Sequence, residues 1–326
     1  MFKPLSLFLA VLLLSAWTGE FAAQAGTPDE LTVKGSTEVP FAVSTDTHAV
    51  WSGGALLVAQ DRFSGAPVFQ VFDREGKQLS QFTFTMSGAG LINIYDHSFA
   101  RGLDGSLAII GSAYSGDSRG AAFLAWVSPD GHEQVIVRTS PFIPRALTVA
   151  SDGTIWVAGK EEKVPGEEPD RSQHVIRHYD KTGKMLGSFI SWSSLGIEPH
   201  TLHPAENSIL ISSRDRIGWY SPDAHTYIEF SLDGAVINRI KTAEHPKHSQ
   251  IGVALCDDGS LFVSASILNG PRQNASWGIF SLHRDRGEWS FIPRSESWGM
   301  MYGCDGTRLA TTTNFTTISW LEPAGK

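Results

Sequence analysis

The sequence predicts an all-β fold, a six-bladed β-propeller of four-stranded blades, from three observations. A turn followed by an unbroken apolar run recurs about every fifty residues along the chain. A second turn signal, built around a glycine, follows the first in successive units. The last unit stops one strand short, and a strand-like segment near the N-terminus can supply that strand. A repeat of this length with matching ends indicates blades that close into a ring, and therefore one domain.

The first signal gives six registers along the chain. Five copies carry glycine in the turn, and the fourth carries Asn207, a residue type that also tolerates positive φ. Each apolar run is continuous rather than alternating, which predicts a strand covered on both faces by neighbouring blades. The copies begin at Gly53, Asp104, Asp152, Glu206, Asp258 and Asp305.

The second signal is a glycine turn between the two outer strands of a unit. Glycine supplies the left-handed residue that a tight hairpin needs. In the third unit the two signals together predict strands over 146–150, 154–159, 174–179 and 184–191. The glycines stand at Gly76, Gly131, Gly183, Gly234 and Gly287.

The two ends of the chain predict how the ring closes. The sixth unit has strand patterns near 299–303, 308–313 and 316–321, and no fourth strand follows them. The segment 30–36 has strand character and precedes the first unit. We expect it to complete the last blade, because an open array would leave exposed sheet edges.

The N-terminus predicts export. Lys3 is followed by an apolar run from Leu5 to Leu14 and by Ala23-Gln24-Ala25, the order of a cleaved secretory signal. We therefore expect a signal peptide over 1–25, one propeller domain over 26–326, and a secreted or periplasmic protein. No later stretch approaches the roughly eighteen apolar residues of a membrane span.

Net charge argues against one class of partner. The formal charge of −8 lacks the clustered cations that nonspecific nucleic-acid binding requires, so we expect no nucleic-acid partner.

The chain has two cysteines, Cys256 and Cys304, each just before the Asp-Gly turn of a neighbouring unit. In an oxidising compartment they could form a disulfide between adjacent inner strands. The alternative is two buried thiols that pack as small hydrophobic side chains. The sequence leaves both interpretations open.

Candidate functional residues follow from the blade pattern. The loops that lead into the innermost strands open at one face, around the channel mouth, and the Asp-Gly turns lie at the other. Counting back from each register places ionisable side chains at the channel mouth: Asp46, Asp96, His97, Arg145, Glu198 and His200, with His203 and His248 nearby. One interpretation is a metal or catalytic cluster, with Asp46, Asp96 and Glu198 as ligands of Ca²⁺ or another divalent cation. The other is a solvated polar rim whose charges do not meet.

The turn motifs resemble those of a known group of propellers. Phe72-Asp73-Arg74-Glu75-Gly76-Lys77 and Tyr179-Asp180-Lys181-Thr182-Gly183-Lys184 are similar to turns of six-bladed NHL-repeat proteins and SMP-30/gluconolactonase-like enzymes. The resemblance implies the same fold. For the enzymes of that group it also implies a divalent metal held by Glu, Asn and Asp where inner strands start. Arg145 stands where the ligand Asn of that group would be.

Two functions remain open from the sequence. The first is an exported binding module for a protein, peptide or glycan at the channel-mouth face, because the blade pattern is complete and no linear catalytic motif accompanies it. The alternative is a metal-dependent hydrolase or lyase at the same face, in which Arg145 would stabilise an anionic group.

Overall fold

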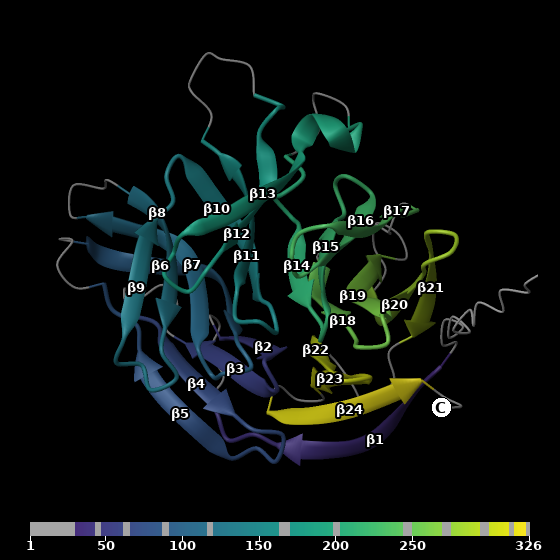
Figure 1. Ribbon diagram of the computed structural model, residues 1–326. Coiled ribbons are helices and arrows are strands. Elements are labelled where there is room, and N and C mark those ends of the chain that lie inside the picture. Colours follow the sequence, from purple (N-terminus) through teal and green to yellow (C-terminus); the bar gives the residue numbers. More distant parts are fainter. Residues whose placement is uncertain are drawn as a thin grey trace, which may run out of the picture.

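The computed structural model shows a six-bladed β-propeller (Figure 1). It describes residues 30–42, 47–60, 66–86, 91–115, 120–162, 170–197, 203–243, 250–268, 275–293, 300–312 and 316–323. Six sheets of four antiparallel strands are arranged around a centre, which confirms the predicted fold class. Among these residues, no helix is long and apolar enough to cross a membrane.

Blades 1 to 5 run outward from the centre in chain order, and blade 6 has β22 innermost and β1 outermost. Blade 1 contains β2 (His48–Ser52), β3 (Ala55–Gln60), β4 (Val68–Phe72) and β5 (Gln78–Thr83); blade 2 contains β6 (Leu91–Arg101), β7 (Leu107–Ser115), β8 (Gly120–Val127) and β9 (Gln134–Arg138); blade 3 contains β10 (Phe142–Val149), β11 (Ile155–Glu161), β12 (His174–Tyr179) and β13 (Met185–Ser191). Blade 4 contains β14 (Ile209–Ser212), β15 (Arg216–Ser221), β16 (Thr226–Ser231) and β17 (Val236–Lys241); blade 5 contains β18 (Gln250–Leu255), β19 (Leu261–Leu268), β20 (Ala275–His283) and β21 (Glu288–Pro293); blade 6 contains β22 (Met301–Asp305), β23 (Arg308–Thr312), β24 (Thr317–Pro323) and β1 (Leu31–Glu38). A short 3-10 helix, Trp192–Leu195, follows β13.

The N-terminal strand closes the ring. β1 pairs antiparallel with β24, from Leu31 opposite Pro323 to Glu38 opposite Thr317, and the two strands lie side by side in Figure 1. The innermost strands β2, β6, β10, β14, β18 and β22 each contact the next around the centre. The predicted completion of the last blade is therefore confirmed.

The core lies between the blades. The second strands are buried on both faces, as their continuous apolar runs predict; Leu57, Ile109 and Val157 are all inaccessible to solvent. Hydrophobic clusters join side chains of adjacent blades, such as Trp156 of blade 3 with Trp219 of blade 4. This packing fixes the position of each innermost strand and therefore the shape of the central channel.

Glycine turns lie at the face opposite the channel mouth. Gly105 and Gly183 adopt φ of +90° and +80°, a backbone conformation that side chains with a Cβ rarely tolerate. Asp152 shows how an Asp-Gly hairpin is closed: its carboxylate accepts hydrogen bonds from the backbone N–H of Thr154 at 2.9 Å and from its hydroxyl at 2.7 Å. The Asp152 carboxylate is therefore engaged in its own turn.

The cysteines are joined in the structure. Cys256, which follows β18, and Cys304 of β22 form a disulfide with a Cα–Cα distance of 5.2 Å and a sequence separation of 48. The bond links the innermost strands of blades 5 and 6.

The register predicted for blade 4 is wrong. The apolar run Ile209–Ile211 belongs to β14, the innermost strand, instead of the second strand. The hairpin that follows is Ser213–Asp215, closed by a 3.0 Å hydrogen bond from the N–H of Ser213 to the carbonyl of Arg216. None of its residues has a positive φ, so the turn needs no glycine and lacks the signal used to find the others.

Candidate functional site

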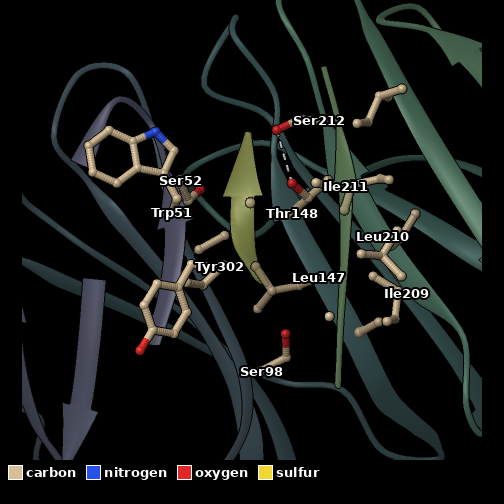
Figure 2. Close-up of a pocket in the computed structure, with 18 of the residues that line it drawn as sticks. Trp51, Ser52, Ser98, Leu147, Thr148, Ile209, Leu210, Ile211, Ser212 and Tyr302 are labelled. Carbon is tan, nitrogen blue, oxygen red and sulfur yellow. Dashed lines mark hydrogen bonds between the residues drawn. The ribbon is translucent and has the colours of Figure 1, made fainter. Parts of the chain in front are cut away.

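A central cavity of about 290 Å³ is enclosed by the six innermost strands. Its wall is mixed: Trp51, Leu147 and Tyr302 supply apolar surface, and Ser98 and Arg145 supply polar groups. Figure 2 shows Ser98, Leu147 and Tyr302 around the same space, contributed by three different blades. Such a cavity is a site where one ligand group can contact several blades at once.

Away from the channel mouth, hydroxyl groups join the innermost strands. Thr148 of β10 donates to the Ser212 hydroxyl of β14 at 3.0 Å (Figure 2). Ser212 in turn donates to the carbonyl of Val149 at 2.9 Å. Between blades 1 and 2, Ser52 donates to the carbonyl of Arg101 at 3.0 Å. These polar groups already have partners within the fold, so ligand recognition is better sought toward the other end of the channel.

Four innermost strands carry a β-bulge at a similar level of the channel. The pairing register shifts between Asp96 and Ser98, between Pro144 and Ala146, between Gln250 and Gly252, and between Met301 and Gly303. The unpaired residues at these shifts are His97, Arg145, Ile251 and Tyr302. A bulge bends the strand and re-aims its side chain, and bulges are common beside functional sites.

The bulges fit the close approach of neighbouring innermost strands. A Cβ on Gly252 would lie 2.5 Å from the carbonyl oxygen of Met301, and one on Gly303 would lie 2.6 Å from that of Trp51. Glycine is therefore required at both positions, directly beside two of the bulges.

Arg145 connects the cavity with a charged cluster between blades 3 and 4. Its Nη2 lies 3.1 Å from Oε1 of Glu206, in the turn that leads into β14. The Nζ of Lys160, from β11, lies 2.6 Å from Oε2 of the same carboxylate. Burial acts to raise the pKa of Glu206, but the hydrogen bond from Lys160 and the charge of Arg145 outweigh it and hold that pKa below its ordinary value. Glu206 is therefore an anion shared by two cations.

His203 adds a neutral group to this cluster. Burial, assisted by the nearby positive charge of Lys160, lowers its pKa to about 4. Its Nδ1 accepts a 3.2 Å hydrogen bond from the N–H of Ala205, which leaves the proton of the neutral ring on Nε2. The ring packs against that of Trp192, with 4.7 Å between their centroids. On Trp192, in turn, the guanidinium carbon of Arg171 lies 5.5 Å from the ring centroid.

The other residues predicted at the channel mouth lie wholly or partly outside the described part of the structure. Asp96 and His97 lie within β6, at the bulge, and their side chains fall outside the described part of the structure. Asp46, Glu198, His200 and His248 also lie outside the described residues. Within the ranges that are described, no three His, Cys, Asp or Glu side chains are grouped so that they could hold a metal ion. The metal site at Asp46, Asp96 and Glu198 stays a prediction.

Counting from the repeat located Arg145 but missed its partners. The count in blade 4 started from the wrong turn, and β14 begins only at Ile209, well after Glu198 and His200. Glu206, interpreted as part of a hairpin at the opposite face, instead lies next to Arg145. The absence of Asp-Gly at Glu206-Asn207 is the sequence signal that could have identified this different role.

Tyr302 was missed for a related reason. In blade 6 the hairpin between β22 and β23 is shorter, so Asp305 pairs directly with Arg308. In blade 3 the corresponding Asp152 lies in a wider turn, between Val149 and Ile155. Counting back from Asp305 by the same number of residues as in the other blades therefore selected residues that precede β22, and Tyr302 was not selected.

Known structures are similar to this chain in fold. A member of the DUF4221 family from Bacteroides vulgatus has a TM-score of 0.52 and 9% identity, over 90% of this chain and 97% of that one. A GH74 xyloglucanase from Xanthomonas campestris has a TM-score of 0.45 and 14% identity, over 88% of this chain and 43% of that one. No protein-family model and no curated protein sequence matches this chain. At 9% identity the similarity to the DUF4221 structure concerns the fold alone and carries no statement about function.

Proposed function

We propose that this chain is an exported binding module that captures a protein, peptide or glycan at the channel-mouth face. The observation that carries the proposal is the cavity of about 290 Å³ with Arg145 in its wall. Bulges in the innermost strands support it, because they turn single residues from separate blades toward one level of the channel.

The size of the cavity suggests how the ligand is held. It lies at the lower end of the roughly 300–1,000 Å³ range of small-molecule sites. One sugar ring or one amino-acid side chain fits such a volume, and a larger ligand would insert that unit and rest its remainder on the surrounding face. Leu147 and Tyr302 offer apolar contact to the inserted unit, and Ser98 offers a hydroxyl group.

The proposal also includes export of the protein and its relationship to a known group of propellers. The charged, apolar and small-residue order of residues 1–25 supports a cleaved signal peptide, and a disulfide suits an oxidising compartment. The turn motifs support a relationship to NHL-repeat or SMP-30/gluconolactonase-like propellers. N-terminal sequencing of the exported protein tests the cleavage, which we expect before Gly26.

A pair of serine variants tests the binding function. Ser98 lines the cavity, and Ser80 lies on the outermost strand of blade 1. Glycan and peptide arrays probed with the purified protein should identify ligands that Ser98→Phe no longer binds, because the ring occupies the cavity. Ser80→Phe is the matched control and should bind as the parent does. The proposal fails if the parent binds no ligand on the arrays, or if Ser98→Phe retains full affinity.

A further inference from the structure

The charged cluster between blades 3 and 4 has more donors than acceptors. Arg145 and Lys160 share the single carboxylate of Glu206, so the three ionised groups carry one net positive charge. Arg145 comes from the bulge of β10, Lys160 from β11, and Glu206 from the turn before β14. The cluster therefore spans two blades at the side of the cavity.

Two of its N–H groups are buried without a hydrogen-bond partner in the described part of the protein, Nε of Arg145 and Nε2 of His203. The Ala205 hydrogen bond to Nδ1 of His203 makes Nε2 a donor rather than an acceptor. Buried donors that stay unsatisfied cost free energy, and they are enriched where a ligand completes the bonding.

The same groups indicate which ligand chemistry fits. His203, whose Nδ1 already accepts a hydrogen bond, and the two cations offer donors, so the complementary group is an acceptor with negative charge. Glu206 shows that the two cations are spaced to hold a carboxylate, one oxygen on each, at 3.1 Å and 2.6 Å. Because Arg145 also lines the central cavity, a carboxylate that enters the cavity can reach it.

We infer that Arg145, Lys160 and His203 form a carboxylate subsite at the channel mouth, in which Glu206 competes with the carboxylate of the ligand for the two cations. This inference rests on the proposed binding function and names the chemical class of the inserted unit. A sugar acid and the carboxyl end of a peptide share this chemistry.

Isothermal titration calorimetry with two matched ligand pairs tests the subsite and separates its sources. D-glucuronate is compared with D-glucose, and N-acetylglycine with N-acetylglycinamide, each pair differing at the carboxylate. We expect one of the two acids to bind at least about tenfold more tightly than its neutral partner, the worth of a charge-assisted hydrogen bond. Binding of D-glucuronate would identify the ligand as a sugar acid, and binding of N-acetylglycine would identify it as the carboxyl end of a peptide.

Two variants should change the affinity for the acid in opposite directions, and a third should leave it unchanged. Arg145→Gln should weaken binding of the acid about tenfold or more, and Glu206→Gln should strengthen it by a similar factor, because a competing carboxylate is removed. A gain of affinity cannot arise from misfolding. Glu161→Gln is the matched control: Glu161 neighbours Lys160 on β11 but pairs with Arg177, at 2.7 Å, outside the cavity wall. It should bind as the parent does.

Failure of the subsite is distinguishable from failure of the binding function. Equal affinity for acid and neutral partner, or equal affinity in the parent, Arg145→Gln and Glu206→Gln, overturns the carboxylate subsite. Neutral ligands whose binding Ser98→Phe abolishes would still support the binding function. If neither acid binds to the parent or to Glu206→Gln, the subsite is also overturned.

Discussion

Acidification should weaken the fold through His203, in a pH range set by its lowered pKa. The pKa of this residue falls from 6.5 to about 4 on folding. Between these values the unfolded chain binds a proton that the folded protein does not, so stability is present above about pH 6.5 and is lost as the pH falls toward 4. The pKa of Glu206 is also lowered, so this carboxylate stabilises the fold as well. Its contribution to the free energy of unfolding is lost only when the pH falls below the usual pKa of a glutamate side chain.

The size of the effect follows from the same shift. One pKa unit corresponds to about 1.4 kcal/mol, so the shift from 6.5 to about 4 would be worth about 3 kcal/mol for a fully enclosed ring. The ring of His203 is only partly buried, and solvent screening reduces the contribution to about 2 kcal/mol. A loss of this size is a large fraction of the stability of a typical domain.

Urea unfolding of the parent and of His203→Asn, near pH 7 and near pH 4.5, measures this contribution. Asn can accept the hydrogen bond from Ala205 but does not titrate, so the variant should lose about 2 kcal/mol less than the parent on acidification. The exposed His174 provides the control, and His174→Asn should behave as the parent does. If the parent and His203→Asn lose the same free energy of unfolding on acidification, His203 does not cause the loss.

Three further predictions concern stability and metal. Glu229 is fully buried, accepts the Tyr227 hydroxyl at 3.0 Å and pairs with Arg284; Glu229→Gln should therefore lower the free energy of unfolding by about 3 kcal/mol, and Tyr227→Phe by about 1 kcal/mol. Urea curves for the two variants check this, and equal losses would count against a buried ion pair. Replacing Cys256 and Cys304 together by serine should cost about 4 kcal/mol, since their disulfide closes a loop of 48 residues; a double variant as stable as the parent under oxidising conditions would contradict this estimate. If Asp46, Asp96 and Glu198 hold a divalent cation, calcium should raise the melting temperature and a chelator should lower it, whereas a melting temperature indifferent to both would remove the metal hypothesis.

The architecture could be predicted from the sequence because the signals that define a blade are local. A glycine such as Gly183 marks a turn through its own backbone conformation, and a run such as Ile155–Val157 reveals burial on both faces through its own composition. Ring closure was equally accessible, because the strand pattern before residue 38 matched the strand missing after Pro323. The turns and the buried runs need only neighbouring residues, and ring closure needs only the strand patterns at the two ends of the chain.

The candidate site was less accessible because it depends on pairing between strands. Arg145 was found by its offset from an Asp-Gly turn, but its contact with Glu206 required the true register of blade 4. A glycine-free turn at Ser213–Asp215 shifted that register without a signal in composition. The neutral state of His203 likewise follows from burial and from Lys160, a residue of another blade.

A crystal structure of the protein with D-glucuronate or N-acetylglycine, whichever binds, tests whether Arg145 holds the carboxylate of a ligand in the cavity. We expect the ligand carboxylate within hydrogen-bonding distance of the guanidinium of Arg145, with the rest of the ligand in the cavity beside Leu147 and Tyr302. The Glu206 carboxylate should move away from one of its two cations. A ligand bound elsewhere, with the pairs of Glu206 to Arg145 and Lys160 unchanged, would show that these cations do not form a carboxylate subsite.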